Sequence, residues 1–260
     1  MEKKYPDNKL KNKIKNGETV FGPFARINSP AVVEIVGYSG FDFVIIDMEH
    51  GPLSYSEAEN MVRAASLSGI TPVIRVPENK DVNIFRALDT GAEGVQIPQI
   101  NDSVAAEYAA RSARYHPLGN RGVCKYVRSA LYSSVPANEY FERSSQEVLT
   151  VLMIEGEKVI NDLDEIATVS EVDVLFLGPY DLSQSLGIPG QVKDSRVTKI
   201  IEKAIGIARN RGKAVGTFTT SAEEAWYWAS RGVQYISIGI DTGLLYESTR
   251  ELVKQLQEKR

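Results

Sequence analysis

Residues 41–52 read FDFVIIDMEHGP, an apolar run that stops abruptly at ionisable residues. The segment Phe43–Ile46 is aromatic and β-branched and lacks the alternation of a half-exposed strand, so it predicts a parallel strand covered on both faces. Asp47, Glu49 and His50 follow at its carboxyl end. In barrels and open α/β sheets, this end of a strand displays reacting groups on a rigid frame. The same residues could instead lead into a solvated loop.

Seven other segments read as strands, and helical patterns separate them. The predicted strands are Val20–Ala25, Pro72–Val76, Gly94–Ile97, Val148–Ile154, Val172–Leu177, Ala214–Phe218 and Tyr235–Ile240. The predicted helices are Pro30–Tyr38, a helix capped at Ser54 or Ser56 that runs to Leu67, Asp81–Leu88, Asn101–Ala113, Glu157–Thr168, Ser195–Arg211, a helix capped at Ser221, and Leu244–Glu258. This alternation in a chain close to the typical length of about 250 residues predicts a single (β/α)₈ TIM barrel. An open doubly wound sheet is the alternative, which the lack of a glycine-rich dinucleotide motif disfavours.

One stretch departs from this alternation. Between residues 114 and 146 the periodicity is weak, and prolines and glycines are frequent. A long irregular stretch inside a compact domain is usually functional, so we expect a loop or lid there, with a short helix near residues 137–141. The whole chain, residues 1–260, predicts one domain that begins with a polar, lysine-rich and partly helical extension.

Composition argues against several classes of protein. The chain has 43% hydrophobic and 25% charged residues, which is enough apolar material for one large core. The formal net charge of −4 argues against a general nucleic-acid binder. No apolar stretch has membrane-spanning length, and none follows the lysine-rich start as in a secretory signal. The single Cys124 excludes an intrachain disulfide framework and suits a reducing cytoplasm, so we expect a cytoplasmic enzyme.

Several charged side chains are predicted to meet at one end of the barrel. Asp47 and His50 follow the second strand, Arg75 ends the third, and Glu155 and Asp181 follow the fifth and sixth. A glutamate and an aspartate on neighbouring strands supply the hard oxygen ligands that Mg²⁺ or Mn²⁺ prefers. The histidine has a pKa range suited to proton transfer. The guanidinium can bind a carboxylate or stabilise an enolate oxygen.

Each of these residues also has a purely structural explanation. Glu155 could interact with a helix dipole, Asp181 could cap a helix, and Arg75 could belong to a structural ion pair. A structural explanation for all of these residues together is less convincing than one for any single residue, because Glu155 and Asp181 follow two neighbouring strands. The second histidine, His116, lies in the long loop, and we assign it no catalytic role.

The sequence resembles one known family over nearly its whole length. The motifs that carry the resemblance are DMEHGP (47–52), PVIRVP (72–77), RALDTGAEGVQIPQI (86–100), HPLGNRGV (116–123), VLMIEG (151–156), FLGPYDLSQSLG (176–187) and SIGIDTGLL (237–245). Together they resemble the HpcH/HpaI family of class II, metal-dependent pyruvate aldolases. The resemblance implies reversible cleavage of a 4-hydroxy-2-oxo acid to pyruvate and an aldehyde, through an enolate at a divalent metal ion. Glu155 and Asp181 would bind this ion, which could be Mg²⁺, Mn²⁺ or Co²⁺.

The resemblance also implies roles for four other residues. His50 would act as the base, and Arg75 would stabilise the enolate. Asp89 would raise the basicity of the histidine, a role that rests on the resemblance alone. Asp47 matches the first motif and would support the pair of His50 and Asp89.

Two positions depart from the pattern of the family. Members commonly have glutamine two residues before the metal-binding glutamate, whereas this chain has Met153. The residue before the metal-binding aspartate is commonly small, whereas this chain has Tyr180. We expect both to contact substrate together with Arg75 and Asp181, so the departures affect the choice of substrate more than the metal chemistry.

Other functions remain open at this point. A related metal-enolate enzyme, such as an oxaloacetate decarboxylase or a CoA-thioester lyase, is the nearest alternative, and a non-catalytic barrel used as a binding module is another. A Schiff-base aldolase is disfavoured because no predicted strand delivers a lysine at its carboxyl end; Lys213 precedes the seventh strand.

A homo-oligomer is also expected. The resemblance implies barrels that exchange their last helix and form trimers of dimers, so the assembly would be a trimer or hexamer. The final helix has apolar residues that suit such packing, namely Leu244, Leu245, Leu252 and Leu256. Packing of this helix on its own barrel is the alternative.

Overall fold

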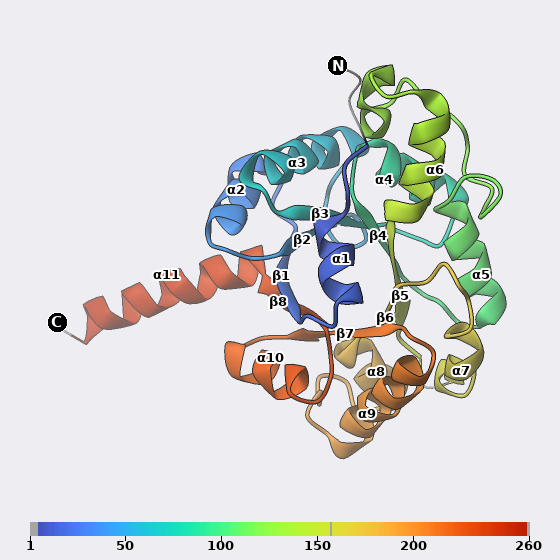
Figure 1. Ribbon diagram of the computed structural model, residues 1–260. Helices are drawn as coiled ribbons and strands as arrows, with labels where there is room; N and C mark the ends of the chain where they lie inside the picture. Colours follow the sequence, from blue (N-terminus) through green and yellow to red (C-terminus); the bar gives the residue numbers. More distant parts are fainter. Residues whose placement is uncertain (1–4, 157, 259–260) are drawn as a thin grey trace.

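The computed structural model describes residues 5–156 and 158–258, and its centre is a closed barrel of parallel strands (Figure 1). The strands are β1 (Val20–Ala25), β2 (Phe43–Asp47), β3 (Thr71–Arg75), β4 (Gly94–Ile97), β5 (Leu149–Ile154), β6 (Val174–Leu177), β7 (Ala214–Thr219) and β8 (Tyr235–Ile240). Each strand pairs with the next one along the chain, and β8 closes the ring on β1. The predicted (β/α)₈ barrel is therefore confirmed.

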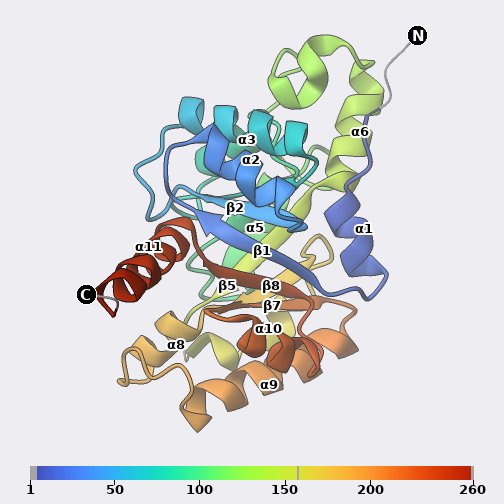
Figure 2. The ribbon, with the colours of Figure 1, turned by 90° about the vertical axis from the view of Figure 1, so that its left-hand side faces the viewer.

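Helices surround this barrel (Figures 1 and 2). They are α1 (Lys9–Lys15), α2 (Pro30–Tyr38), α3 (Tyr55–Ser68), α4 (Asp81–Asp89), α5 (Ser103–Ser112), α6 (Ala137–Glu147), α7 (Leu163–Ile166), α8 (Pro179–Ser185), α9 (Ser195–Asn210), α10 (Ala222–Ala229) and α11 (Asp241–Gln257), with 3₁₀ helices η1 (Arg128–Ser133) and η2 (Lys158–Ile160). Within the described ranges, no helix is both long and apolar enough to cross a bilayer.

The unbroken apolar run of β2 reflects two separate cores. Phe43 and Ile45 belong to the cluster inside the barrel, whereas Val44 and Ile46 belong to the cluster between strands and helices. Successive side chains of a strand point to opposite faces, so both faces of β2 must be apolar. All four side chains are fully buried, which explains why the sequence shows no polar alternation here.

Local sequence signals fix the ends of α3 as predicted. The Ser54 hydroxyl accepts a hydrogen bond from the Glu57 amide, and the Glu57 carboxylate accepts one from the Ser54 amide, which together form a capping box. At the other end, Gly69 adopts a left-handed conformation with φ of 79°. Glycine adopts this conformation without the steric cost that other residues meet, so the helix stops there.

Helix α1 covers the amino end of the barrel. The side chain of Asn8 donates hydrogen bonds to the carbonyls of Glu93 (2.8 Å) and Glu147 (3.0 Å), which precede β4 and β5. The ammonium of the buried Lys11 forms a 3.0 Å ion pair with Asp173, which precedes β6. These contacts fasten the predicted polar extension to the end of the barrel opposite the carboxyl ends of the strands.

The stretch 114–146 holds more regular structure than expected, and its role as a functional loop or lid stays a prediction. It contains η1 and α6, and the hydroxyls of Tyr115 and Tyr140 lie 3.0 Å apart in a small cluster of its own. Its last residues lie at the amino end of the barrel, where Glu147 contacts the N-terminal segment. The predicted short helix is the longer α6, whose buried residues are Tyr140, Ser144 and Ser145, so an apolar pattern could not reveal it.

Two other helices differ from the prediction. Residue 157, the expected start of a helix that runs to Thr168, lies outside the described residues, and the rest of that stretch forms η2 and the short α7. Directly after β6, the chain forms α8, which is not among the helices predicted from the sequence. Pro179 occupies the first turn of α8, where its lack of an amide N–H does no harm. Asp181 therefore lies inside the first turn and does not cap the helix.

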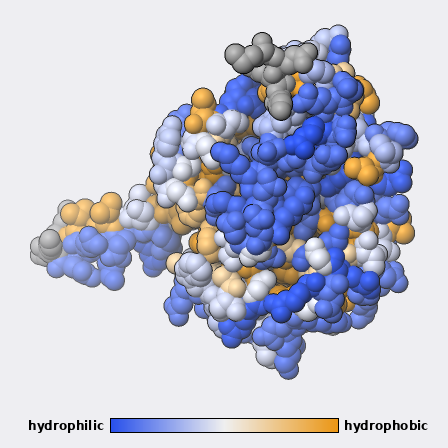
Figure 3. Space-filling model, in the orientation of Figure 1, coloured by the Kyte–Doolittle hydropathy of each residue, from blue (hydrophilic) through white to orange (hydrophobic). Residues whose placement is uncertain are grey.

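Helix α11 projects away from the barrel (Figures 1 and 2). Asp241 is its buried residue. The predicted apolar residues Leu244, Leu245, Leu252 and Leu256 are between 45% and 68% exposed. Figure 3 shows apolar surface along one side of the projecting helix and polar surface along the other. Within this chain, α11 therefore does not pack its apolar side on its own barrel.

We predict that Asn8→Ala will lower the free energy of unfolding by about 1–3 kcal/mol, because two buried carbonyls lose their donor and α1 loses its N-cap. Urea denaturation followed by circular dichroism measures this change. Asn12→Ala, at an exposed position of α1, is the matched control. Equal unfolding midpoints for the two variants would contradict the role assigned to Asn8.

Candidate active site

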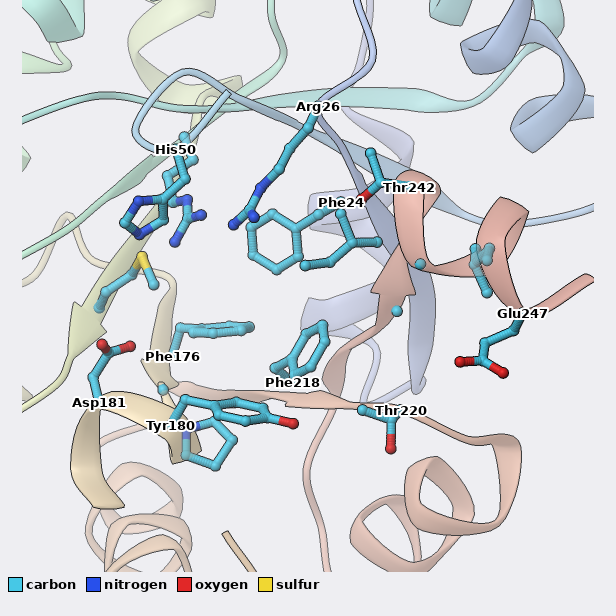
Figure 4. Close-up of a pocket in the computed structure, with 18 residues that line it drawn as sticks. Phe24, Arg26, His50, Phe176, Tyr180, Asp181, Phe218, Thr220, Thr242 and Glu247 are labelled. Atoms are coloured by element: carbon cyan, nitrogen blue, oxygen red, sulfur yellow. The ribbon is translucent and has the colours of Figure 1, made fainter. Parts of the chain in front are cut away.

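A cavity of about 670 Å³ opens at the carboxyl end of the barrel. Figure 4 shows His50 and Arg26 on one side of it, Asp181 and Tyr180 on another, and the rings of Phe24, Phe176 and Phe218 between them. The side chains come from β1, β6 and β7, from the loops that follow β1 and β2, and from the first turn of α8. The predicted convergence of charged residues at one mouth is therefore present.

The fully buried carboxylate of Asp47 is the centre of the charged cluster. It accepts hydrogen bonds from Arg75 Nε (2.8 Å), Arg75 Nη2 (2.7 Å) and Arg26 Nε (2.6 Å). It also accepts the backbone amides of Glu49 (3.2 Å) and His50 (3.3 Å). Burial would raise the pKa of Asp47, but the hydrogen bonds and charges of Arg75, followed by those of Arg26, outweigh it and hold the pKa below its usual value.

Arg75 is held by ion pairs on two sides. Besides the bidentate contact with Asp47, its Nη1 lies 2.9 Å from Oε2 of Glu49. Its guanidinium carbon also lies 4.7 Å from the centre of the Phe24 ring. The structural ion pair considered for Arg75 therefore exists, and it fixes the guanidinium at the wall of the cavity. Burial raises the pKa of Glu49, and the charge of Arg75 opposes part of this shift.

Two further carboxylates lie on either side of Gly178. A Cβ atom added at Gly178 would lie 3.1 Å from Oδ2 of Asp181 and 3.6 Å from Cγ of Glu155. The glutamate carboxylate accepts a hydrogen bond from the backbone amide of Gln99 at 2.8 Å. Burial raises the pKa of Glu155 to about 7; the Gln99 amide opposes this shift, and the negative charges of Asp181 and Glu49 add to it.

This pair has the chemistry of a divalent-cation site. A cation would stabilise the charge of the Glu155 carboxylate, whose pKa burial and neighbouring acids raise, and Gly178 leaves the space beside the two acids open. Across the described parts of the chain, no cluster of three or more His, Cys, Asp or Glu residues suited to a metal ion is present. Glu155 and Asp181 supply two oxygen donors, so a divalent cation held by them would take its remaining ligands from water and substrate.

The two histidines lie in different surroundings. The side chain of His50 is 58% exposed at the cavity, and its Nε2 lies 3.8 Å from Oε2 of Glu49. His116 is exposed on the segment that follows α5, away from the cavity. Only the first histidine can reach a ligand in the mouth.

Within this chain the structure does not bring Asp89 to His50, so the role of Asp89 toward the histidine stays a prediction. Asp89 is the last residue of α4 and lies toward the amino end of β4. Its carboxylate accepts a 2.7 Å hydrogen bond from Arg121. A helix that follows a barrel strand runs back toward the opposite end, so its last turn is remote from the mouth.

Met153 and Tyr180 both line the cavity as expected. Met153 is 2% exposed near the end of β5. Tyr180 is 48% exposed, and its ring centre lies 6.0 Å from that of Phe218. The first residue therefore contributes to the floor of the cavity and the second to its rim.

The sequence analysis missed Arg26 and the role of Glu49. Arg26 directly follows β1, so the rule that selected Asp47 and Glu155 would also have selected it. The ion pair of Glu49 with Arg75 depends on the path of the loop after β2, and the pattern of apolar and polar residues in the sequence does not predict that path.

We predict that Glu155→Gln will stabilise the protein at about pH 8 in buffer without divalent cations. The folded-state pKa of about 7 lies above the ordinary value of 4.5, so the folded protein binds a proton that the unfolded chain releases in this window. Stability is therefore lost as pH rises from 4.5 toward 7, and glutamine avoids that loss.

Thermal unfolding at about pH 5 and pH 8 tests this, with the exposed Glu247→Gln as the control. The difference in midpoint between Glu155→Gln and the unmodified protein should grow with pH. A difference that stays constant or shrinks would contradict the raised pKa.

Comparison with known proteins agrees with this geometry. Residues 21–248 match the family model described as HpcH/HpaI aldolase/citrate lyase. A pyruvate aldolase of Rhizobium etli is 33% identical over 95% of this chain and 96% of its own, and a 5-keto-4-deoxy-D-glucarate aldolase of Salmonella paratyphi A is 31% identical over 94% and 95%. The solved structure of the citrate synthase SbnG superposes with a TM-score of 0.88 and 31% identity, over 96% of this chain and 98% of its own. The chain therefore belongs to the HpcH/HpaI aldolase/citrate lyase family, and it is a lyase of the aldolase type.

Proposed function

We propose that this enzyme reversibly cleaves a 4-hydroxy-2-oxo acid into pyruvate and an aldehyde, with Glu155 and Asp181 holding a divalent cation such as Mg²⁺, Mn²⁺ or Co²⁺. The observation that carries the proposal is the pair of acids beside Gly178, in which Glu155 has a pKa raised to about 7 and Asp181 lines the same cavity as His50 and Arg75. The pyruvate and keto-deoxy-sugar acid aldolases among its relatives support the substrate class.

The chemistry requires stabilisation of an enolate. When bound, the cation supplies Lewis-acid stabilisation of the negative charge that develops on the 2-oxo group. Arg75 adds a fixed positive charge on the same side of the cavity, and its ion pairs keep its guanidinium in one orientation. Fixed donors need no reorganisation when the charge appears, which is why they lower the barrier.

His50 is the group we assign to proton transfer. In the cleavage direction it takes the proton of the 4-hydroxyl, the C3–C4 bond breaks, and its electrons form the enolate as the aldehyde leaves. A proton then returns to C3 and gives the methyl group of pyruvate. The Asp47 carboxylate binds the His50 amide at 3.3 Å, so it sets the position of the loop that carries the base.

A second candidate is another reaction through an enolate, such as decarboxylation of oxaloacetate or a citrate-type condensation. The likeness to the citrate synthase SbnG favours it. Both candidates share formation of an enolate next to Glu155 and Asp181, and they differ in the compound that reacts with it. Product analysis with an aldehyde, oxaloacetate or an acyl-CoA separates them.

Deuterium exchange into the methyl group of pyruvate tests the enolate step. We expect exchange in D₂O with Mg²⁺, Mn²⁺ or Co²⁺ and a loss of about 100-fold or more after chelation or in Glu155→Gln, because charge stabilisation is removed. Proton NMR measures the rate, and Glu247→Gln, a carboxylate elsewhere on the cavity wall, is the control. Undiminished exchange after exhaustive chelation would contradict metal dependence.

Met153 and Tyr180 should act on the aldehyde. Methionine in place of an amide removes about one hydrogen bond, on the order of 1 kcal/mol, and the tyrosine ring narrows the rim. We expect Met153→Gln combined with Tyr180→Ala to raise aldol rates with hydroxylated aldehydes more than the exchange rate of pyruvate. Both rates are measured by NMR, and an equal rise in both would show that these residues act on the enolate.

The projecting α11 leads us to propose a homo-oligomer, a trimer or hexamer, in which a second copy covers its apolar residues. Light scattering at micromolar concentration should give a mass above that of the monomer. Leu252→Glu combined with Leu256→Glu should lower it, because charges would replace exposed leucines on the projecting helix. Glu251→Gln is the control, and a monomeric mass of the unmodified protein would refute the assembly.

A further inference from the structure

The guanidinium of Arg26 has hydrogen-bond partners within the chain for only some of its N–H groups. Its Nε donates to Asp47 at 2.6 Å, and its backbone amide donates to the buried carboxylate of Asp241 at 2.9 Å. Both the side chain and the main chain are therefore fixed. Among the described residues, no hydrogen-bond partner of Nη1 or Nη2 is found, and the side chain is 29% exposed where it lines the cavity.

The difference from Arg75 is informative. Arg75 uses Nε and Nη2 on Asp47 and Nη1 on Glu49, so acids of the protein contact all three of its nitrogens. Arg26 presents the edge formed by Nη1 and Nη2 to the cavity. Two parallel N–H donors on this edge match the two oxygens of a carboxylate.

An aromatic wall lines the cavity next to Arg26. In Figure 4 the ring of Phe24 lies beside Arg26, and the rings of Phe176 and Phe218 lie between Phe24 and Tyr180. The ring centres of Phe24 and Phe176 are 6.5 Å apart, and those of Phe24 and Phe218 are 6.0 Å apart, so the wall is continuous. Rings offer dispersion contacts but cannot hydrogen-bond the hydroxyl groups of a polyol as strong acceptors would.

We propose that Arg26 is a specificity-determining residue that binds the carboxylate of the carbonyl acceptor, so that the enzyme prefers an oxo acid with a short, unhydroxylated body over a neutral or polyhydroxylated aldehyde. The proposal rests on the proposed aldol function. The reaction joins C3 of pyruvate to the aldehyde carbon of the acceptor; a proton leaves C3, the carbonyl oxygen becomes a hydroxyl, and no group is released.

Arg26 serves the acceptor and not pyruvate for a geometric reason. Pyruvate must place its 2-oxo group beside Glu155 and Asp181, and Figure 4 shows Asp181 and Arg26 on opposite sides of the cavity. The second substrate must lie on the remaining side of the enolate. Its carboxylate is then the group within reach of the free edge of Arg26.

The test compares two acceptors in each variant. We measure kcat/KM by NMR for glyoxylate and for acetaldehyde, with pyruvate as donor, in the unmodified enzyme, Arg26→Met, Arg26→Lys and Thr242→Val. Both acceptors use the same enolate, so any damage to Asp47 or Arg75 cancels in the glyoxylate-to-acetaldehyde ratio. Thr242→Val, at another residue that lines the cavity, is the matched control for a change without loss of charge.

We expect Arg26→Met to lower this ratio by about 10- to 100-fold, the effect of one lost charge-assisted bidentate contact. Arg26→Lys should lower it less, and Thr242→Val should leave it within about twofold. A ratio within about twofold of the unmodified enzyme in Arg26→Met would overturn the proposal. A raised KM for pyruvate in the exchange reaction, with an unchanged ratio, would show that Arg26 binds the donor and would overturn it as well.

A binding measurement separates failure of this proposal from failure of the aldol function. Saturation-transfer NMR with 4-methylbenzoate, in excess chelator, needs neither a metal ion nor turnover. The signal should be present in the unmodified protein and be lost in Arg26→Met but not in Thr242→Val. If no aldol product forms with either acceptor while this pattern holds, the aldol function fails and the carboxylate site stands; a signal that persists in Arg26→Met would refute the site.

Discussion

The buried carboxylate of Asp47 is the interaction on which the rest of the site depends. It joins the end of β2 to Arg75 on β3, to Arg26 after β1, and to the loop that carries His50. A carboxylate without solvent is stable only when such donors surround it, so these strands and this loop are held in one arrangement. Loss of any donor would leave charge uncompensated in the interior. The orientation of the arginines is therefore a property of the barrel itself.

The two ends of the barrel contribute differently to stability. At the amino end, Asn8 and Lys11 satisfy polar groups that precede the strands, and the segment 114–146 adds a separate cluster around Tyr140. At the carboxyl end, Glu155 is ionised at a cost in stability, because burial and neighbouring acids raise its pKa to about 7. Contacts that stabilise the fold at the amino end thus coexist with a carboxylate at the carboxyl end whose ionisation destabilises it. Such a loss of stability at the active site is common in enzymes.

The sequence was sufficient for the fold and for most of the site, for reasons that can be named. Strands such as β2 are apolar on both faces, and capping residues such as Ser54 mark helix ends, so local patterns report them directly. The mouth then follows from topology, because residues after parallel strands converge. The role of Asp89 stays a prediction, because a motif conveys sequence position and not the partner of a side chain, and within this chain Asp89 contacts Arg121. Helix α6 was underestimated because its buried side chains are Tyr140 and serines, which an apolar pattern ignores.

The position of α11 has a consequence for how the enzyme behaves on dilution. Thr242, Gly243 and Leu244, in its first turn, line the cavity, whereas its later turns project beyond the barrel (Figure 2). A rigid helix transmits a constraint along its length, so whatever grips the distal turns also restricts the motion of the cavity wall. In an assembly of identical chains, enzyme concentration would then set how well ordered that wall is. Specific activity would cease to be a constant and would decline as subunits separate.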